Sequence, residues 1–87
     1  MQDDAKSSFA VIRYNQRTYA SGGVVAVVKG RSAAEKIMDQ YEKSQSPEDR
    51  HAGWRYFMEA SDLKPGMDAQ EATNLRQSRL DLRESKP

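Results

Sequence analysis

His51 is the only histidine in the chain, and there is no cysteine, so the residues that most often carry nucleophilic or metal chemistry are nearly absent. A Ser-His-acid arrangement would have to use His51, which has Glu48 three positions before it and Arg55 four positions after it on one predicted helix surface. No Gly-x-Ser-x-Gly turn is present. We therefore expect no catalytic residues, no metal site and no cofactor, and we expect a protein that is not an enzyme and has no small-molecule substrate.

Two other patterns contain the right residue types for chemistry, but each has a structural explanation. The acidic pair Glu48-Asp49 follows Ser46-Pro47, which is typical of a helix start, where the helix dipole favours negative charge. Gly30-Arg31-Ser32 joins an apolar run to a predicted helix, a place where free amides can hold a phosphate. Its glycines lack the spacing of a nucleotide-binding phosphate loop, so a turn followed by a helix cap explains this segment.

Basic side chains form two groups that could follow a phosphate backbone. The first lies at helical spacing near the C-terminus and comprises Arg76, Arg79 and Arg83, and the second, in the amino-terminal third, includes Arg13, Arg17 and Arg31. The net charge is only +1, and acidic residues interrupt the C-terminal group. Nucleic-acid binding by these arginines is therefore the alternative prediction rather than the leading one.

The densest aromatic cluster runs from Trp54 to Met58. On a helix, Trp54, Phe57 and Met58 share one face, which we assign to the core, whereas Tyr56 points away from it. Aromatic side chains are enriched at the centres of protein interfaces. We therefore predict Tyr56 as a partner-binding residue. We add Tyr14 and Tyr19 of the predicted strands, which offer aromatic faces to a partner if they point to solvent.

The order of local patterns predicts strands followed by helices. Strand-forming residues occupy 8–14, 18–21 and 24–28, with Asn15-Gln16-Arg17 as a hairpin loop and Gly22-Gly23 as a bulge, bend or turn. Helical spacing and capping residues predict helices over about 32–44, 47–61 and 69–84, the first with a capping box from Ser32 to Glu35. This order is an α+β fold with a two- or three-stranded antiparallel sheet toward the N-terminus and three helices after it.

The run Val24–Val28 is apolar on both faces, so we expect it to be covered on two sides. A chain of 87 residues buries a small core and has a small margin of stability. We expect such a chain to gain cover from a partner or from a second copy of itself. We predict one domain over 8–84, a disordered lead over 1–7 and a tail over 85–87.

No apolar run is long enough to span a membrane, and no signal-peptide pattern follows Met1, so we expect a cytoplasmic protein without a membrane partner. Its size and sparse catalytic inventory are typical of small accessory proteins of bacteria, plasmids and phages. The leading prediction is a non-enzymatic protein–protein interaction or regulatory module that acts by surface binding, with a homodimer as one form of it. The alternative is a nucleic-acid-binding accessory protein.

Overall fold

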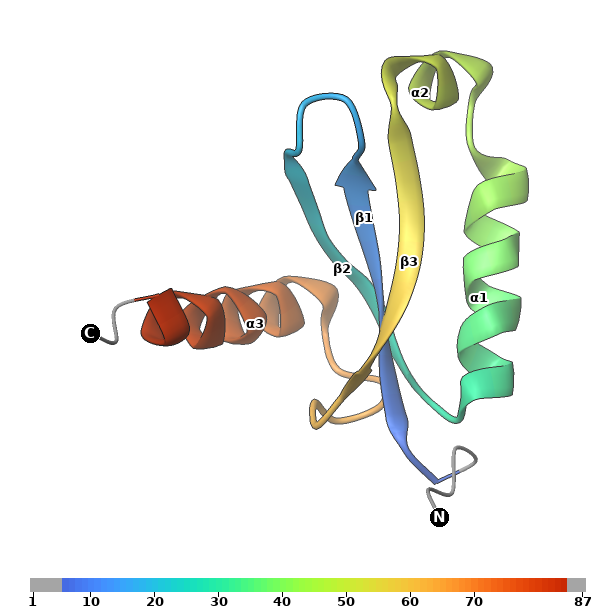
Figure 1. Cartoon of the computed structure of the whole chain (residues 1–87). Coiled ribbons are helices and arrows are strands. Elements are labelled where there is room, and N and C mark those ends of the chain that lie inside the picture. The colour runs from blue at the N-terminus through green and yellow to red at the C-terminus, as the bar shows by residue number, and fades with distance from the viewer. Residues whose placement is uncertain (1–5, 85–87) are drawn as a thin grey trace.

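The chain folds into a three-stranded antiparallel sheet with helices on both faces, which confirms the predicted α+β class (Figure 1). The computed structural model describes residues 6–84, and for 80–84 the backbone alone. Residues 1–5 and 85–87, within the predicted lead and tail, lie outside the described residues. The elements are, in order, β1 (Ser8–Asn15), β2 (Ser21–Lys29), α1 (Arg31–Ser44), α2 (Pro47–Ala52), β3 (Trp54–Ser61) and α3 (Ala69–Glu84).

β1 is the central strand, and the sheet order is β2-β1-β3. Ser8 lies opposite Lys29 on one side and Ser61 on the other. The pairing of β1 with β2 slips twice, which makes Val25 and Gly22 the extra residues of two bulges. The bulge alternative for Gly22-Gly23 is therefore confirmed.

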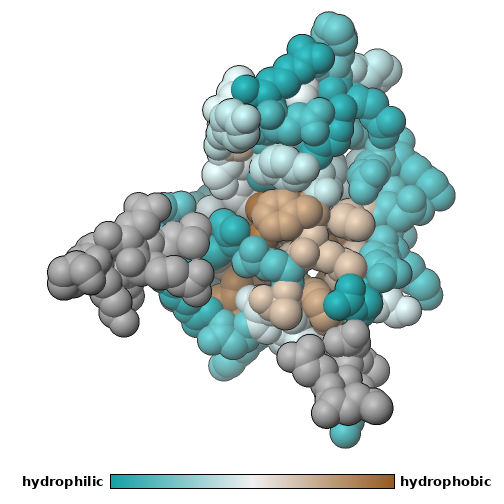
Figure 2. Space-filling view, in the orientation of Figure 1, coloured by the Kyte–Doolittle hydropathy of each residue, from teal (hydrophilic) through white to brown (hydrophobic). Residues whose placement is uncertain are grey.

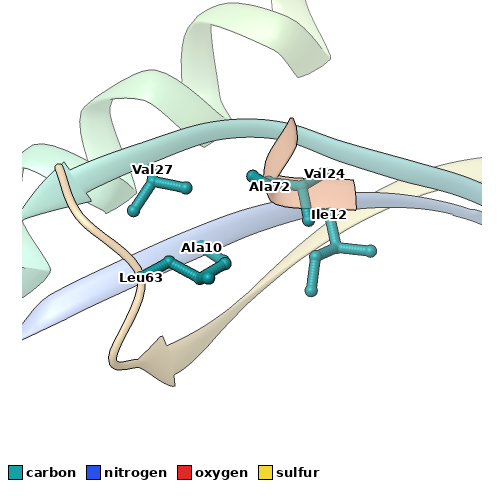
Figure 3. Close-up of a cluster of buried hydrophobic side chains, with 6 residues drawn as sticks. All are labelled: Ala10, Ile12, Val24, Val27, Leu63 and Ala72. Carbon is teal, nitrogen blue, oxygen red and sulfur yellow. The ribbon is translucent and has the colours of Figure 1, made fainter. Parts of the chain in front are cut away.

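Each face of the sheet has its own apolar cluster. On the face covered by α1, the buried residues are Phe9, Val11 and Ala34, with Ile37, Met38, Tyr56 and Met58 among the partly buried side chains packed against them. On the face covered by α3 and the loop before it, the buried residues are Ala10, Ile12, Val24, Val27, Leu63 and Ala72 (Figure 3). Strand residues alternate between the two clusters, as the period of a strand requires.

The two-sided cover predicted for Val24–Val28 is present, and the chain itself supplies it. Val24 and Val27 are each 3% exposed and pack with Leu63 and Ala72. Val25 and Val28 are partly buried against the α1 cluster. The chain therefore covers both faces of the valine run, fully at Val24 and Val27 and partly at Val25, Ala26 and Val28, so the run does not by itself require a second molecule as cover.

The predicted helix over 47–61 is wrong in its second half. The helix α2 ends at Ala52, because Gly53 adopts the left-handed conformation (φ 105°, ψ 6°) that terminates helices. Trp54–Ser61 then pairs with β1 as a strand, so Trp54, Phe57 and Met58 do not share a face. The predicted start is confirmed, since the Ser46 hydroxyl accepts the Asp49 N–H at 3.1 Å.

Two smaller predictions are also wrong. Residues 18–20 form a loop rather than a strand, because Asn15 Oδ1 accepts the N–H groups of Arg17 and Thr18 and folds the chain locally. The predicted capping box does not form either. The helix α1 starts at Arg31 after the N-cap Gly30, without a side-chain cap. The Gly30 N–H donates to the Ser7 carbonyl at 2.7 Å, which fixes this earlier start.

The helix α3 has the predicted bounds and docks by one end. Asp68 Oδ2 accepts the N–H groups of Gln70 and Glu71, which is a helix N-cap. Ala72 is fully buried, whereas Leu75 is 38% exposed. The helix then runs away from the sheet (Figure 1). Within residues 6–84, no helix has both the length and the apolar character that a membrane crossing requires.

Candidate functional site

The outer edge of β2 is closed by the chain segment that follows β3. The Gly66 N–H donates to the Val27 carbonyl at 2.8 Å. The Val24 N–H donates to the Thr73 hydroxyl at 2.9 Å, and the same hydroxyl lies 3.3 Å from the Val24 carbonyl. Gly23 permits this approach, because a Cβ built there would lie 2.9 Å from Thr73 Oγ1. The β2 edge is therefore occupied at both backbone groups of Val24 and at the Val27 carbonyl.

The outer edge of β3 is open along most of its length. In an antiparallel sheet the N–H and C=O groups of alternate residues point to opposite sides. The Asn15 N–H donates to the Ala20 carbonyl, on the β2 side of β1. Trp54 lies opposite Asn15 in β3, and because Asn15 points away from β3, Trp54 directs its own backbone groups away from β1. By alternation Tyr56, Met58 and Ala60 do the same. No described group, which means the backbone of residues 6–84 and the side chains of residues 6–79, bonds to these outward groups of the three residues.

The start of this edge is the exception. The Trp54 carbonyl accepts hydrogen bonds from Gln45 Nε2 at 2.9 Å and from Arg55 Nη1 at 2.7 Å. On the α1 face, the Arg13 guanidinium carbon lies 3.7 Å from the centre of the Trp54 ring, and Arg13 is 3.6 Å from an Asp49 carboxylate oxygen. These contacts hold the first residue of β3 in place. The outer backbone groups in the middle of the strand have no such contacts in the described part of the chain.

The open edge carries apolar side chains on both faces of the sheet. Tyr56 stacks on Tyr41 of α1, with ring centres 5.4 Å apart, and Met58 packs against the same cluster. On the other face, Phe57 meets Tyr14 edge to face at 5.2 Å. Figure 2 shows apolar surface gathered over β3, between α1 and α3. The edge thus combines unpaired backbone groups with partly exposed aromatic and sulfur-containing side chains.

Beyond the edge, two ion pairs join α3 to the end of β3. Arg76 holds Glu59 with two hydrogen bonds, at 3.1 and 3.2 Å, and Arg79 contacts Asp62. Together with Ser7 and Ser8 these four side chains line a shallow groove. The groove contains as many acidic as basic side chains, so it offers no net positive charge to a phosphate.

The predicted partner-binding tyrosines lie at three separate places. Tyr56 lies on the open β3 edge, although on the α1 face of a strand rather than on the outer face of a helix. Tyr14 lies beside Phe57, on the opposite face of the sheet. Tyr19 is 90% exposed in the β1–β2 loop and has a positive φ of 62°. Only Tyr56 and Tyr14 are near the open edge.

The predicted basic groups do not form one surface. Arg13 and Arg17 lie by α2, at one end of the sheet, and Arg31 lies over Phe9, at the other end. Arg76 and Arg79 are paired with acids on the far side of the sheet from α1, and the Arg83 side chain lies outside the described residues. Nucleic-acid binding stays a prediction, and no charge cluster in the described chain adds to it.

The remaining candidate chemistry lies on the surface. His51 is exposed in the last turn of α2. Residues 29–33 with Glu35 and Lys36 line a shallow depression at the start of α1. Among residues 6–79, whose side chains the structure describes, no three acidic or histidine side chains gather in a way that would hold a metal ion.

Sequence reasoning missed Met58 and Ala60 as edge residues, because it placed them on a helix. Their signal was the alternation of Trp54, Tyr56, Met58 and Ala60 with Arg55, Phe57 and Glu59. Comparisons with protein-family models, with curated proteins and with solved structures gave no match.

Proposed function

We propose that the protein is a non-enzymatic protein-binding module that adds an extended strand of a partner to the outer edge of β3. The observation that carries this proposal is the difference between the two sheet edges. The β2 edge is closed by Gly66 and Thr73, whereas the outward backbone groups of Tyr56, Met58 and Ala60 have no partner within residues 6–84.

Strand addition fits the chemistry of this edge. An added strand receives main-chain hydrogen bonds along the edge, and side chains on both faces set which sequence fits best. Tyr56 and Met58 would contact alternate side chains on the α1 face, and Phe57 would contact those on the α3 face. Natural proteins usually protect an open edge with charge, bulges or cover. The middle of this edge, Tyr56 to Met58, is apolar and uncovered between Arg55 and Glu59, which supports a binding role.

The test compares two substitutions at Met58 that differ in the backbone N–H. Met58→Pro and Met58→Ala both remove the side chain, but only proline removes the outward N–H, and it leaves the bonds to β1 intact. Extended peptides are first selected against the wild-type chain from a random displayed library. Their affinities are then measured by fluorescence anisotropy with the labelled peptide.

After correction for the fraction of folded protein, we expect the dissociation constant of the selected peptides for the Met58→Ala variant to lie within about threefold of that for the wild type. We expect the Met58→Pro variant to bind them at least tenfold more weakly, because one edge hydrogen bond and its neighbour are lost. Equal binding by both variants would place the binding surface elsewhere. Failure of the library to yield any peptide that protects the Tyr56, Met58 and Ala60 amides would also overturn the proposal.

A further inference from the structure

We propose that the strand added to this edge is β3 of a second copy, in an antiparallel register centred on Phe57. This inference rests on the proposed function, because it uses the same open edge, and it names the occupant. It would join two three-stranded sheets into one continuous sheet with a two-fold axis at Phe57.

The direction of the backbone groups limits the registers. Only residues whose backbone groups point outward and are unbonded can exchange hydrogen bonds across the new interface, and these are Tyr56, Met58 and Ala60. Trp54 also points outward, but its carbonyl is already bonded to Gln45 and Arg55. Centring the two-fold axis on Phe57 places Tyr56 opposite Met58 of the second copy, and Met58 opposite its Tyr56. Both are then hydrogen-bonded pairs, and Phe57 faces its own copy in the closer, non-hydrogen-bonded position.

The charges on β3 select this register among the two-fold alternatives. Arg55 and Glu59 lie on the same face of the strand, two residues on either side of Phe57. In the Phe57-centred register each Arg55 lies opposite Glu59 of the other copy. Centring on Tyr56 or Met58 leaves one of the charges opposite Phe57, and centring on Arg55 or Glu59 opposes like charges, which destabilises a strand pair.

Both charged side chains can enter such a pair. The Glu59 side chain is 38% exposed while it holds Arg76, and a carboxylate has room for further donors. Arg55 bonds only to main-chain carbonyls of Arg50 and Trp54 among the described residues. It can therefore turn toward a carboxylate on the added strand without breaking a side-chain ion pair.

The closed β2 edge explains why this assembly would stop at two copies. After the two β3 strands pair, the outer strands of the joined sheet are both β2. On each β2 edge, Thr73 already bonds Val24 and Gly66 already bonds Val27, so a further strand would have to displace the segment that holds these two residues. The apolar surface over β3 would lie at the centre of the dimer (Figure 2).

The test uses charge reversal at Arg55 and Glu59, with the dissociation constant measured by analytical ultracentrifugation. Arg55→Glu alone and Glu59→Arg alone each oppose like charges twice across the axis, and we expect each to weaken the dimer at least tenfold. A mixture of the two variants restores opposite charges at every position. We expect this mixture to form a heterodimer within about threefold of the wild-type dissociation constant.

Two controls separate the interface from folding. Lys36→Glu and Glu35→Arg change the same charges at exposed positions of α1, and we expect both to dimerise like the wild type.

The chain has no cysteine, so Phe57→Cys provides a second readout. Facing residues in a non-hydrogen-bonded position have Cα atoms about 4.5 Å apart, within the range that a disulfide spans. Mild oxidation would therefore join two Phe57→Cys chains, and would not join Arg55→Cys chains, because position 55 faces position 59 of the other copy.

A wild-type chain that stays monomeric at millimolar concentration but still binds selected peptides at β3 would overturn this inference and leave the proposed function standing. A dimer that is insensitive to both charge reversals, or a mixture that fails to recover, would overturn the register. If Glu59→Arg does not fold, the Phe57→Cys and Arg55→Cys chains decide the register alone.

Discussion

Replacing Asn15 with alanine is expected to lower the free energy of unfolding by about 2–3 kcal/mol. Asn15 is 4% exposed and lies where the β1–β2 loop meets α2. Its Oδ1 accepts the N–H groups of Arg17 at 2.9 Å and Thr18 at 3.0 Å, and its Nδ2 donates to the Ala52 carbonyl at 3.1 Å. Each bond contributes about 1 kcal/mol, reduced where the exposed loop can bond to water instead.

The measurement is urea denaturation followed by Trp54 fluorescence, with thermal unfolding as a second readout. For a domain of this size, a loss of 2–3 kcal/mol lowers the melting temperature by about 10–20 °C. The control is Gln16→Ala, because the neighbouring Gln16 side chain is exposed, and its loss should change stability by less than about 0.5 kcal/mol. An Asn15→Ala variant as stable as Gln16→Ala would show that these three hydrogen bonds do not stabilise the fold.

The hydrogen bonds of Asn15 also affect the position of β3. The Gln16 N–H donates to the Gly53 carbonyl at 2.8 Å, so the loop that Asn15 shapes holds the residue just before β3. A slip of one residue in β3 would turn Tyr56 and Met58 to the opposite face. We therefore expect the Asn15→Ala variant to lose affinity at the β3 edge as well as stability, and Gln16→Ala to keep both.

Three further experiments test the fold around the edge. Gly53→Ala should cost about 2 kcal/mol or more in thermal unfolding, because φ is 105° and the new Cβ would lie 2.8 Å from Asn15 Oδ1; an unchanged melting temperature would contradict this. Thr73→Val should lower the free energy of unfolding by about 1–2 kcal/mol and speed amide exchange at Val24, because the Val24 N–H loses its acceptor. Slow exchange at Val24 in this variant would show that the hydroxyl does not close the edge. A double-mutant cycle of Arg76→Ala with Glu59→Ala should give a coupling of about 0.5–1 kcal/mol that falls in 1 M salt, since both side chains are partly exposed, and a salt-independent coupling would argue against an ion pair.

Much of the fold was predictable from local signals. Ser46-Pro47 and Asp68 mark the starts of α2 and α3. Pro65-Gly66 is typical of a turn with a positive φ at the glycine, and the φ of Gly66 is 80°. The helical spacing of Ala34, Ile37, Met38 and Tyr41 predicted the face by which α1 packs on the sheet. In each case one residue type suits one backbone conformation, so neighbours in sequence were sufficient.

The strand β3 and its open edge were not predictable in the same way. Trp54, Phe57 and Met58 fit a helical stripe, and the same residues fit a strand with Trp54 and Met58 on one face. The choice depends on Gly53, whose left-handed conformation is held by contacts with the distant β1–β2 loop. Which edge is open depends on α3, which approaches β2 from almost fifty residues away in sequence.

Residue-resolved amide hydrogen exchange at low and high protein concentration shows whether the β3 edge is open and whether it accepts a strand. In dilute solution, the amides of Tyr56, Met58 and Ala60 should exchange fast, while the Val24 amide, bonded to Thr73, exchanges slowly. At high concentration Tyr56 and Met58 should become protected and Val24 should not change. Slow exchange at Tyr56, Met58 and Ala60 in the dilute monomer, or fast exchange at every concentration and with every bound peptide, would contradict an open edge that accepts a strand.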